Sequence, residues 1–140
     1  MQRPRTSHLQ ALHHTLKYIQ GTIGQGILLK ATDHLSLKAY SDSDWAACPF
    51  SRRSVTGYVI HLGNSPISWK SKKQSTVSRS SSEAEYRAMA TVMSELIWVK
   101  SVLAAIGIFL DRPMYLFCDN QATLHIAKNT VFLEIQNTSR

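Results

Sequence analysis

The sequence predicts an α/β domain built on a mixed sheet, in which three antiparallel strands precede a crossover helix and a parallel fourth strand. Two observations carry this prediction. Segments within residues 35–71 alternate apolar and polar side chains, which is typical of strands with one buried face. Residues 81–106 instead repeat apolar side chains at helical spacing and end at Gly107. A length of 140 residues suits one such domain.

The composition indicates a globular and basic protein. Hydrophobic residues make up 44% of the chain, and 16 Lys and Arg against 9 Asp and Glu give a formal net charge of +7. This charge serves solubility, and it also favours a polyanionic partner such as nucleic acid. Cys48 and Cys118 have neither metal-site nor disulfide-framework spacing, which favours a reducing, intracellular compartment. No apolar run approaches about 18 residues, so no membrane span is expected.

The elements before the first acidic residues are a helix and a hairpin. Leucine and isoleucine recur at helical spacing between Ser7, a suitable N-cap, and Gly21, so a helix is predicted there. Residues 26–30 and 35–40 are then predicted to pair as a hairpin around residues 32–34.

Two more strands follow, over residues 56–63 and 67–71, with a turn of Gly, Asn, Ser and Pro at residues 63–66. Residues 70–74 and 78–82 are basic and rich in serine, and a polar linker is predicted there.

The long helix is predicted to turn one apolar stripe toward the sheet. The members of that stripe are Tyr86, Met89, Ala90, Met93, Leu96, Ile97 and Leu103. A fourth strand over residues 114–118 and a short helix over residues 122–129 complete the order.

Three acidic side chains are predicted to meet at one edge of this sheet. Asp42 and Asp119 end strands, and Glu85 lies near the start of the crossover helix. Sites in open α/β sheets gather at the carboxyl ends of strands. Converging carboxylates without His or Cys between them suit hard cations such as Mg²⁺ or Mn²⁺. Simpler interpretations stay open. Asp42 and Asp44 could lie in a solvated turn after the strand, and Asp119 could be the N-cap of a helix. Glu83 could stabilise the helix start through the helix dipole.

Five motifs surround these acids. They are Tyr-Ser-Asp-Ser-Asp-Trp-Ala at 40–46, Arg-Ser-Val-Thr-Gly-Tyr at 53–58, Ile-Ser-Trp-Lys-Ser-Lys-Lys-Gln at 67–74, Val-Ser-Arg-Ser-Ser-Ser-Glu-Ala-Glu-Tyr-Arg-Ala at 77–88, and Phe-Cys-Asp-Asn-Gln at 117–121. Together they resemble the ribonuclease H domain of copia-type retrotransposon Pol polyproteins. By this resemblance, residues 1–30 look like the end of the preceding reverse transcriptase domain. Residues 31–132 are then an incomplete ribonuclease H-like domain, and residues 133–140 are a divergent tail.

The resemblance implies two-metal hydrolysis of the RNA strand of RNA–DNA hybrids, with Mg²⁺ or Mn²⁺ as the cofactor. It implies that Asp42, Glu85 and Asp119 are the catalytic, metal-binding acids, with Asp44 and Glu83 as second choices. Basic side chains that could contact phosphates are Arg53, Lys72, Lys73 and Arg79.

The chain departs from the family pattern beyond residue 132. The family's fourth acid, in a His-x-Glu-x-Asp-like segment, has no match, and neither do the last strand and the last helix. Glu134 does not align with the missing acid. The resemblance therefore implies impaired hydrolysis, and the alternative is a non-catalytic retroelement relic with at most weak nucleic-acid binding. An integrase-type transferase of the same fold would need the order Asp, Asp, Glu, whereas this chain has Asp, Glu, Asp.

Overall fold

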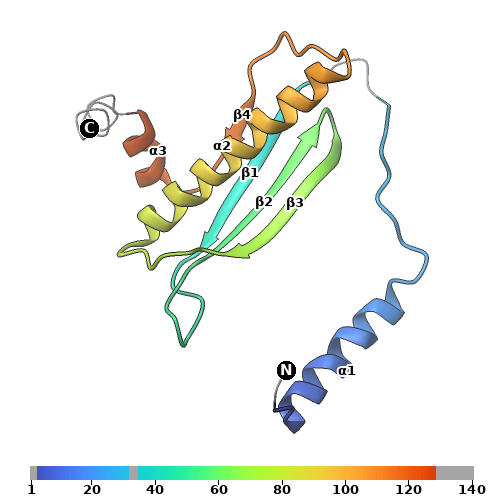
Figure 1. Ribbon diagram of the computed structural model, residues 1–140, viewed down its shortest axis with the longest axis vertical. Coiled ribbons are helices and arrows are strands. Elements are labelled where there is room, and N and C mark those ends of the chain that lie inside the picture. Colours follow the sequence, from blue (N-terminus) through green and yellow to red (C-terminus); the bar gives the residue numbers. More distant parts are fainter. Residues whose placement is uncertain (1–2, 32–34, 129–140) are drawn as a thin grey trace.

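The computed structural model describes residues 3–31 and 35–128. In chain order, the elements of these residues are α1 (Thr6–Gly21), β1 (Leu37–Asp44), β2 (Val55–Leu62), β3 (Ser65–Lys73), α2 (Ser81–Ala105), β4 (Tyr115–Phe117) and α3 (Gln121–Lys128) (Figure 1). From β1 onward, the order of strands and helices is the one that the sequence predicts.

The four strands form one mixed sheet in the order β3-β2-β1-β4. β2 runs antiparallel to both of its neighbours, and β4 runs parallel to β1 with Phe117 opposite Tyr40. Gly63, with a φ of 61°, makes the tight turn between β2 and β3, a conformation that glycine adopts readily. The parallel pair needs a long crossover, which α2 provides. The predicted fold class, a mixed sheet consistent with a ribonuclease H-like fold, is confirmed.

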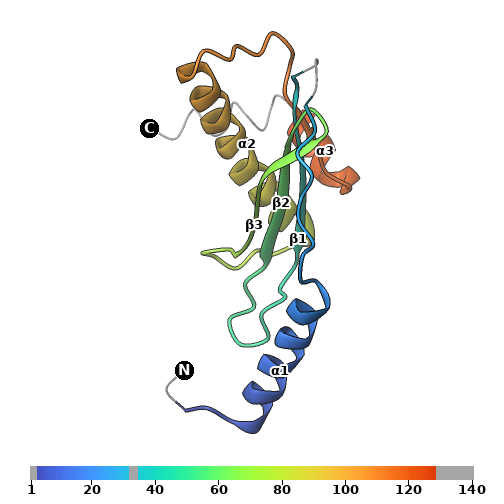
Figure 2. The ribbon, with the colours of Figure 1, turned by 90° about the vertical axis from the view of Figure 1, so that its right-hand side faces the viewer.

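The core lies between one face of the sheet and α2, which runs along that face (Figure 2). The buried core residues are Leu37, Ala39, Tyr58 and Ile60 from the sheet and Val92, Leu96, Val99 and Leu103 from α2. Full burial of a large apolar side chain contributes roughly 1.5–3 kcal/mol, so this single layer of contacts holds α2 on the sheet. By length and composition α2 could cross a membrane, but here it packs as the core helix of a folded domain.

The predicted apolar stripe of α2 was wrong in its register. Of the predicted members only Leu96 and Leu103 are buried, while Ile97 is 54% exposed and Met93 is 44% exposed. The buried residues are Ala84, Glu85, Ala88, Val92, Leu96, Val99 and Leu103. Ala84 in the first turn has no exposed surface, whereas the prediction favoured larger side chains such as Met89 and Met93.

The predicted hairpin was also wrong. Residues 26–30 form no strand, and residues 32–34 lie outside the described residues. Over residues 38–40, β1 pairs with β2 on one side and with β4 on the other, so no edge is left there for an earlier strand. The backbone of Lys30 instead bonds a side chain: its N–H donates to Ser65 Oγ at 2.9 Å, and its carbonyl accepts from the same hydroxyl at 3.2 Å.

Two strands are longer than predicted. β1 continues to Asp44, so Asp42 and Asp44 lie in the strand and not in a turn after it. β3 continues to Lys73, so the first part of the predicted basic linker is strand. Pairing along the whole of β2, from Val55 to Leu62, supports serine and lysine in β3 despite their modest strand preference.

The predicted N-terminal helix is confirmed as α1, with Arg5 in place of Ser7 at its N-cap. None of the residues of α1 is buried, and the helix stands apart from the sheet (Figure 1).

Candidate metal centre

The candidate centre lies where β1 continues past the end of β4. The pairing between these strands stops at Tyr40 and Phe117, four residues before β1 ends at Asp44. In this stretch the backbone N–H of Ser43 donates to two carboxylates, Asp42 Oδ1 at 2.8 Å and Glu85 Oε1 at 3.0 Å. The two oxygens share one donor, so an acid of β1 and an acid of α2 lie side by side.

Glu85 is the buried acid of this centre, with 5% of its surface exposed. Burial raises the pKa of Glu85, the Ser43 N–H opposes this shift, and the charges of Asp42 and Asp119 raise the pKa further. Within residues 3–31 and 35–128, no Lys or Arg forms an ion pair with Glu85. A buried carboxylate among other acids and without a basic partner is a fitting ligand for a bound cation.

Glu83 takes part in the N-terminal cap of α2 and not in the candidate centre. Its backbone N–H donates to the N-cap hydroxyl of Ser80 at 3.1 Å, and its carboxylate accepts from the backbone N–H of Arg79 at 2.8 Å. It also pairs with Arg87 at 2.8 Å. The Arg79 N–H and then Arg87 lower the pKa of Glu83. The helix-start interpretation therefore describes Glu83 well, while Glu85 is the glutamate that faces the other acids.

Asp119 lies two residues after the end of β4 and is exposed. The N–H of Thr123 donates to Asn120 Oδ1 at 2.9 Å, so Asn120 and not Asp119 supplies the side-chain cap of α3. Thr123 is fully buried, and its hydroxyl donates to the carbonyl of Ser82 at 3.2 Å, which fixes α3 against the first turn of α2. This arrangement leaves the Asp119 carboxylate for another role.

Cys118 joins the acids, which the sequence-based prediction missed. Ligand atoms of Glu85, Cys118 and Asp119 all lie within 4.8 Å of one another, and Cys118 Sγ is 3.7 Å from Glu85 Oε2. Burial raises the pKa of the Cys118 thiol, which nearby acid charges raise further. The prediction set both cysteines aside for want of a ligand spacing. The available signal was the position of Cys118 directly before a strand-ending acid.

The structure thus brings three of the predicted residues together and leaves two aside. Asp42 lies beside the group of Glu85 and Asp119, and its charge is among those that raise the pKa of Glu85. Asp44 is exposed at the last position of β1, and Glu83 is used in the helix cap. The ligand roles of Asp42, Glu85 and Asp119 remain predictions.

Gln74 fixes the position of the centre on the sheet. Its side-chain amide donates to Thr56 Oγ1 at 3.0 Å and to the carbonyl of Ala84 at 2.9 Å, with a longer contact of 3.4 Å to Ser43 Oγ. The hydroxyl of Ser78 donates back to Gln74 Oε1 at 3.1 Å. One side chain therefore joins β1, β2 and the start of α2, the three segments that surround Glu85.

The chain was compared with known proteins. Over 132 residues it is 48% identical to the retrovirus-related Pol polyprotein from transposon RE1 of Arabidopsis thaliana and 47% identical to that from transposon RE2. It is 33% identical over the same length to the retrovirus-related Pol polyprotein from transposon TNT 1-94 of Nicotiana tabacum. The chain is a homologue of retrovirus-related Pol polyproteins from copia-like transposons. The transposon part of the resemblance is thereby confirmed.

Each match covers 94% of this Pol homologue but only 9–10% of the relative, so the chain spans a small part of their length. No protein-family model matches the chain, and no solved structure matches it at a significant level.

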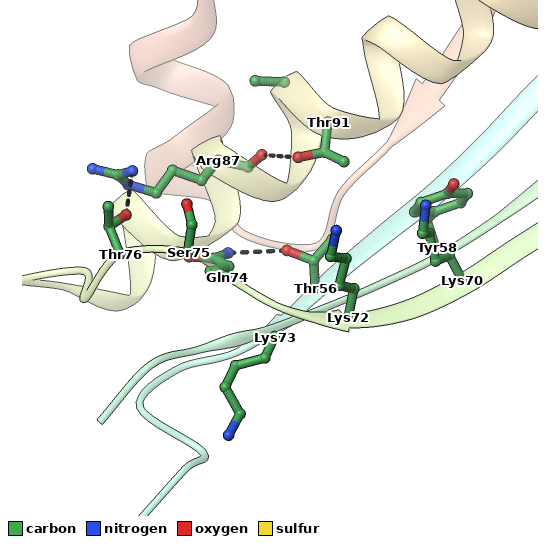
Figure 3. A pocket seen from close by; sticks show the side chains of 11 residues that line it. Thr56, Tyr58, Lys70, Lys72, Lys73, Gln74, Ser75, Thr76, Arg87 and Thr91 are labelled. Atoms are coloured by element: carbon green, nitrogen blue, oxygen red, sulfur yellow. Dashed lines mark hydrogen bonds between the residues drawn. The ribbon is translucent and has the colours of Figure 1, made fainter. Parts of the chain in front are cut away.

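A basic groove of about 400 Å³ lies beside Gln74 in this Pol homologue, between β3 and α2 (Figure 3). Lys70 and Lys72 share one face of β3 and point to the same side, while Arg87 lies across on α2. Lys73 borders the groove, but its side chain turns away, and its Nζ donates to Cys48 Sγ at 3.1 Å. The lining residues are Thr56, Tyr58, Lys70, Lys72, Lys73, Gln74, Ser75, Thr76, Arg87, Ala90 and Thr91.

The predicted basic residues are thus spread over more than one surface. Arg53 is exposed in the loop before β2, and Arg79 is exposed in the turn before α2. The groove adds Lys70 and Arg87, which the prediction did not include. The signal for Lys70 was present in the sequence, because a residue two positions before Lys72 on a strand lies on the same face.

Proposed function

We propose that this chain carries out metal-dependent hydrolysis of the RNA strand of RNA–DNA hybrids as part of a transposon Pol polyprotein. The observation that carries the proposal is the position of Glu85, which shares the Ser43 N–H with Asp42 and has a carboxylate oxygen within 4.8 Å of one from Asp119. Their order in the chain and their motifs match the ribonuclease H pattern, and the homology to transposon Pol polyproteins supports the setting.

Asp42, Glu85 and Asp119 would hold Mg²⁺ or Mn²⁺ in this proposal, because carboxylate oxygens are the ligands that these ions prefer. Such ions, when bound, activate a water and stabilise the leaving oxygen of a phosphodiester. The chain's own contribution is to orient the ligands. The Ser43 N–H holds one oxygen of Glu85, and the exposed Asp42 and Asp119 leave the centre open to a substrate.

Cleavage of a labelled RNA–DNA hybrid tests the proposal. With Mg²⁺ or Mn²⁺ we expect slow release of RNA fragments, because three acids offer few ligands for a second ion. Asp42→Asn is expected to lower the rate by roughly 10²–10³-fold, the usual loss when one source of transition-state stabilisation is removed. Asp44→Asn is the matched control on the same face of β1, and it is expected to change the rate little.

Two outcomes would count against this proposal. Hybrid binding without cleavage in either ion would favour the alternative, a non-catalytic retroelement relic. Cleavage that Asp42→Asn leaves unchanged would remove this centre from the reaction.

The basic groove supports the second half of the proposal, binding of the hybrid. Gln74 lines the groove and also bonds Ser43 and Ala84, the residues beside Asp42 and Glu85 in the chain. In this proposal Lys70 and Lys72 contact the phosphate backbone of a hybrid that also reaches the centre. Lysine side chains that contact phosphates release counterions, so such binding weakens as salt rises.

The double variant Lys70→Ala/Lys72→Ala is expected to bind the hybrid more weakly and with less dependence on salt. Each lost phosphate contact lowers the slope of log affinity against log salt by about 0.9. Fluorescence anisotropy at several salt concentrations measures both effects. Lys100→Ala is the control, since this exposed lysine lies roughly 20 Å beyond Arg87 along α2. Tight binding that salt does not affect would contradict phosphate contacts.

A further inference from the structure

We propose that Cys118 makes the candidate centre a site for a thiophilic divalent cation such as Zn²⁺ or Cd²⁺, held by Glu85, Cys118 and Asp119. This inference concerns binding alone, and it does not require that the chain cleave a hybrid. It goes beyond the proposed function because a centre built only of carboxylates favours hard cations.

The ligand atoms already have the spacing of such a site. A tetrahedral zinc ion with sulfur at about 2.3 Å and oxygen at about 2.0 Å separates these two ligand atoms by about 3.5 Å. The distance from Cys118 Sγ to Glu85 Oε2 is 3.7 Å. An Asp119 oxygen lies within 4.8 Å of Cys118 Sγ and of a Glu85 carboxylate oxygen, so a small rotation of this exposed side chain brings the third ligand into place.

The surroundings support the same arrangement. The Ser43 N–H holds Oε1 of Glu85, which is the kind of outer contact that orients metal-binding carboxylates. Glu85 is buried, Cys118 is partly buried and Asp119 is exposed, so a cation can reach the centre from the solvent side. Three protein ligands leave a fourth position for water, as in zinc sites that are open.

Binding involves no oxidation or reduction. The cation displaces the proton of the Cys118 thiol, the proton leaves to solvent, and the thiolate donates its electron pair to the cation. A thiolate contributes little to Mg²⁺ binding, because Mg²⁺ prefers oxygen ligands. A thiophilic cation in this position would also occupy Glu85 and Asp119, and would so compete with Mg²⁺ for both carboxylates.

Titration with Cd²⁺ tests the inference through the ultraviolet absorption that a cadmium–thiolate bond produces. The full chain carries Cys48→Ser in every sample, which removes the other cysteine. We expect a saturable absorption band at one equivalent of Cd²⁺, and an equal concentration of Mg²⁺ should leave it in place. Adding Cys118→Ser should abolish the band. Adding Asp119→Asn or Glu85→Gln should weaken Cd²⁺ binding at least about tenfold, since even outer-shell partners cost that much.

A band that survives Cys118→Ser would overturn the site. If Asp119→Asn leaves the Cd²⁺ affinity unchanged, the ligand is a lone thiol and the three-ligand centre is wrong. Asp119 is exposed, so this variant is expected to fold normally. Circular dichroism of each metal-free variant establishes that it is folded. The absorption readout needs no nucleic acid, so the two proposals can fail separately. If the Cys48→Ser protein cleaves hybrids with Mg²⁺ but shows no cadmium band, the thiophilic site is wrong and the proposed hydrolysis is not affected. If it shows the band but cleaves no hybrid, the proposed hydrolysis fails and the thiophilic site is supported.

Discussion

Glu85→Gln is expected to raise the melting temperature of the metal-free protein by a few degrees at pH 8. Burial and the charges of Asp42 and Asp119 disfavour the ionised carboxylate, and the folded chain therefore binds this proton more tightly than the unfolded chain does. The contribution to stability is complete below the unfolded pKa and falls as the pH rises through the raised folded pKa. At pH 4 the difference between the two proteins should therefore shrink. Thermal unfolding followed by circular dichroism at both pH values measures it.

The same variant should lose any stabilisation by Mg²⁺. A cation that binds only the folded state raises its stability with concentration, and it would favour the ionised form of Glu85 that burial opposes. Glu85→Gln is therefore expected to be more stable than the original protein without metal and to gain no stability from Mg²⁺. Both results are expected of an acid that serves binding at a cost in stability. If Glu85→Gln melts like the original protein at pH 8, Glu85 does not carry an unfavourable charge in the fold.

Glu83→Gln is the matched control with the opposite sign. The Arg79 N–H and Arg87 lower the pKa of Glu83, so its ionised form stabilises the start of α2. That contribution is present above the unfolded pKa and is lost as the pH falls through the lowered folded pKa. The variant should therefore melt lower than the original protein at pH 8, with little difference in strong acid.

Leu96→Ala is expected to lower the free energy of unfolding by about 2–5 kcal/mol, a large share of the roughly 5–15 kcal/mol that a domain has. Leu96 has no exposed surface and lies in the layer between α2 and the sheet. Urea denaturation measures the loss. Ile97→Ala, one position along, should cost within about 0.5 kcal/mol, because Ile97 is 54% exposed. Equal losses at both positions would contradict the register of α2.

The order of elements from β1 onward could be predicted from the sequence because apolar residues recur at every second position in strands and at every third or fourth position in helices. The register of α2 could not be predicted, since Ala84 does not stand out by size and only its burial in the fold identifies it. The length of β3 depends on pairing with β2, which lies outside any local pattern. The hairpin prediction failed for the complementary reason, because residues 26–30 find no free edge of β1.

The acids of the candidate centre were within reach of sequence reasoning because strand ends and helix starts meet at one edge of such a sheet. Glu85 differs from Glu83 by its place among buried residues, and Asp119 does not cap α3 because its neighbour Asn120 does. Cys118 was missed because it lies 33 positions from Glu85 in the chain, and only folding brings the two side chains together.

The lysines of β3 have a consequence for solubility. β3 is an outer strand of the sheet, so one side of its nine-residue backbone has no partner strand among residues 3–31 and 35–128. Charged side chains, and lysine above all, discourage such edge-to-edge aggregation. Lys70, Lys72 and Lys73 therefore protect this edge against aggregation, in addition to lining or bordering the groove. Replacing Lys70 and Lys72 by alanine is expected to increase self-association through β3, so self-association has to be measured together with hybrid affinity.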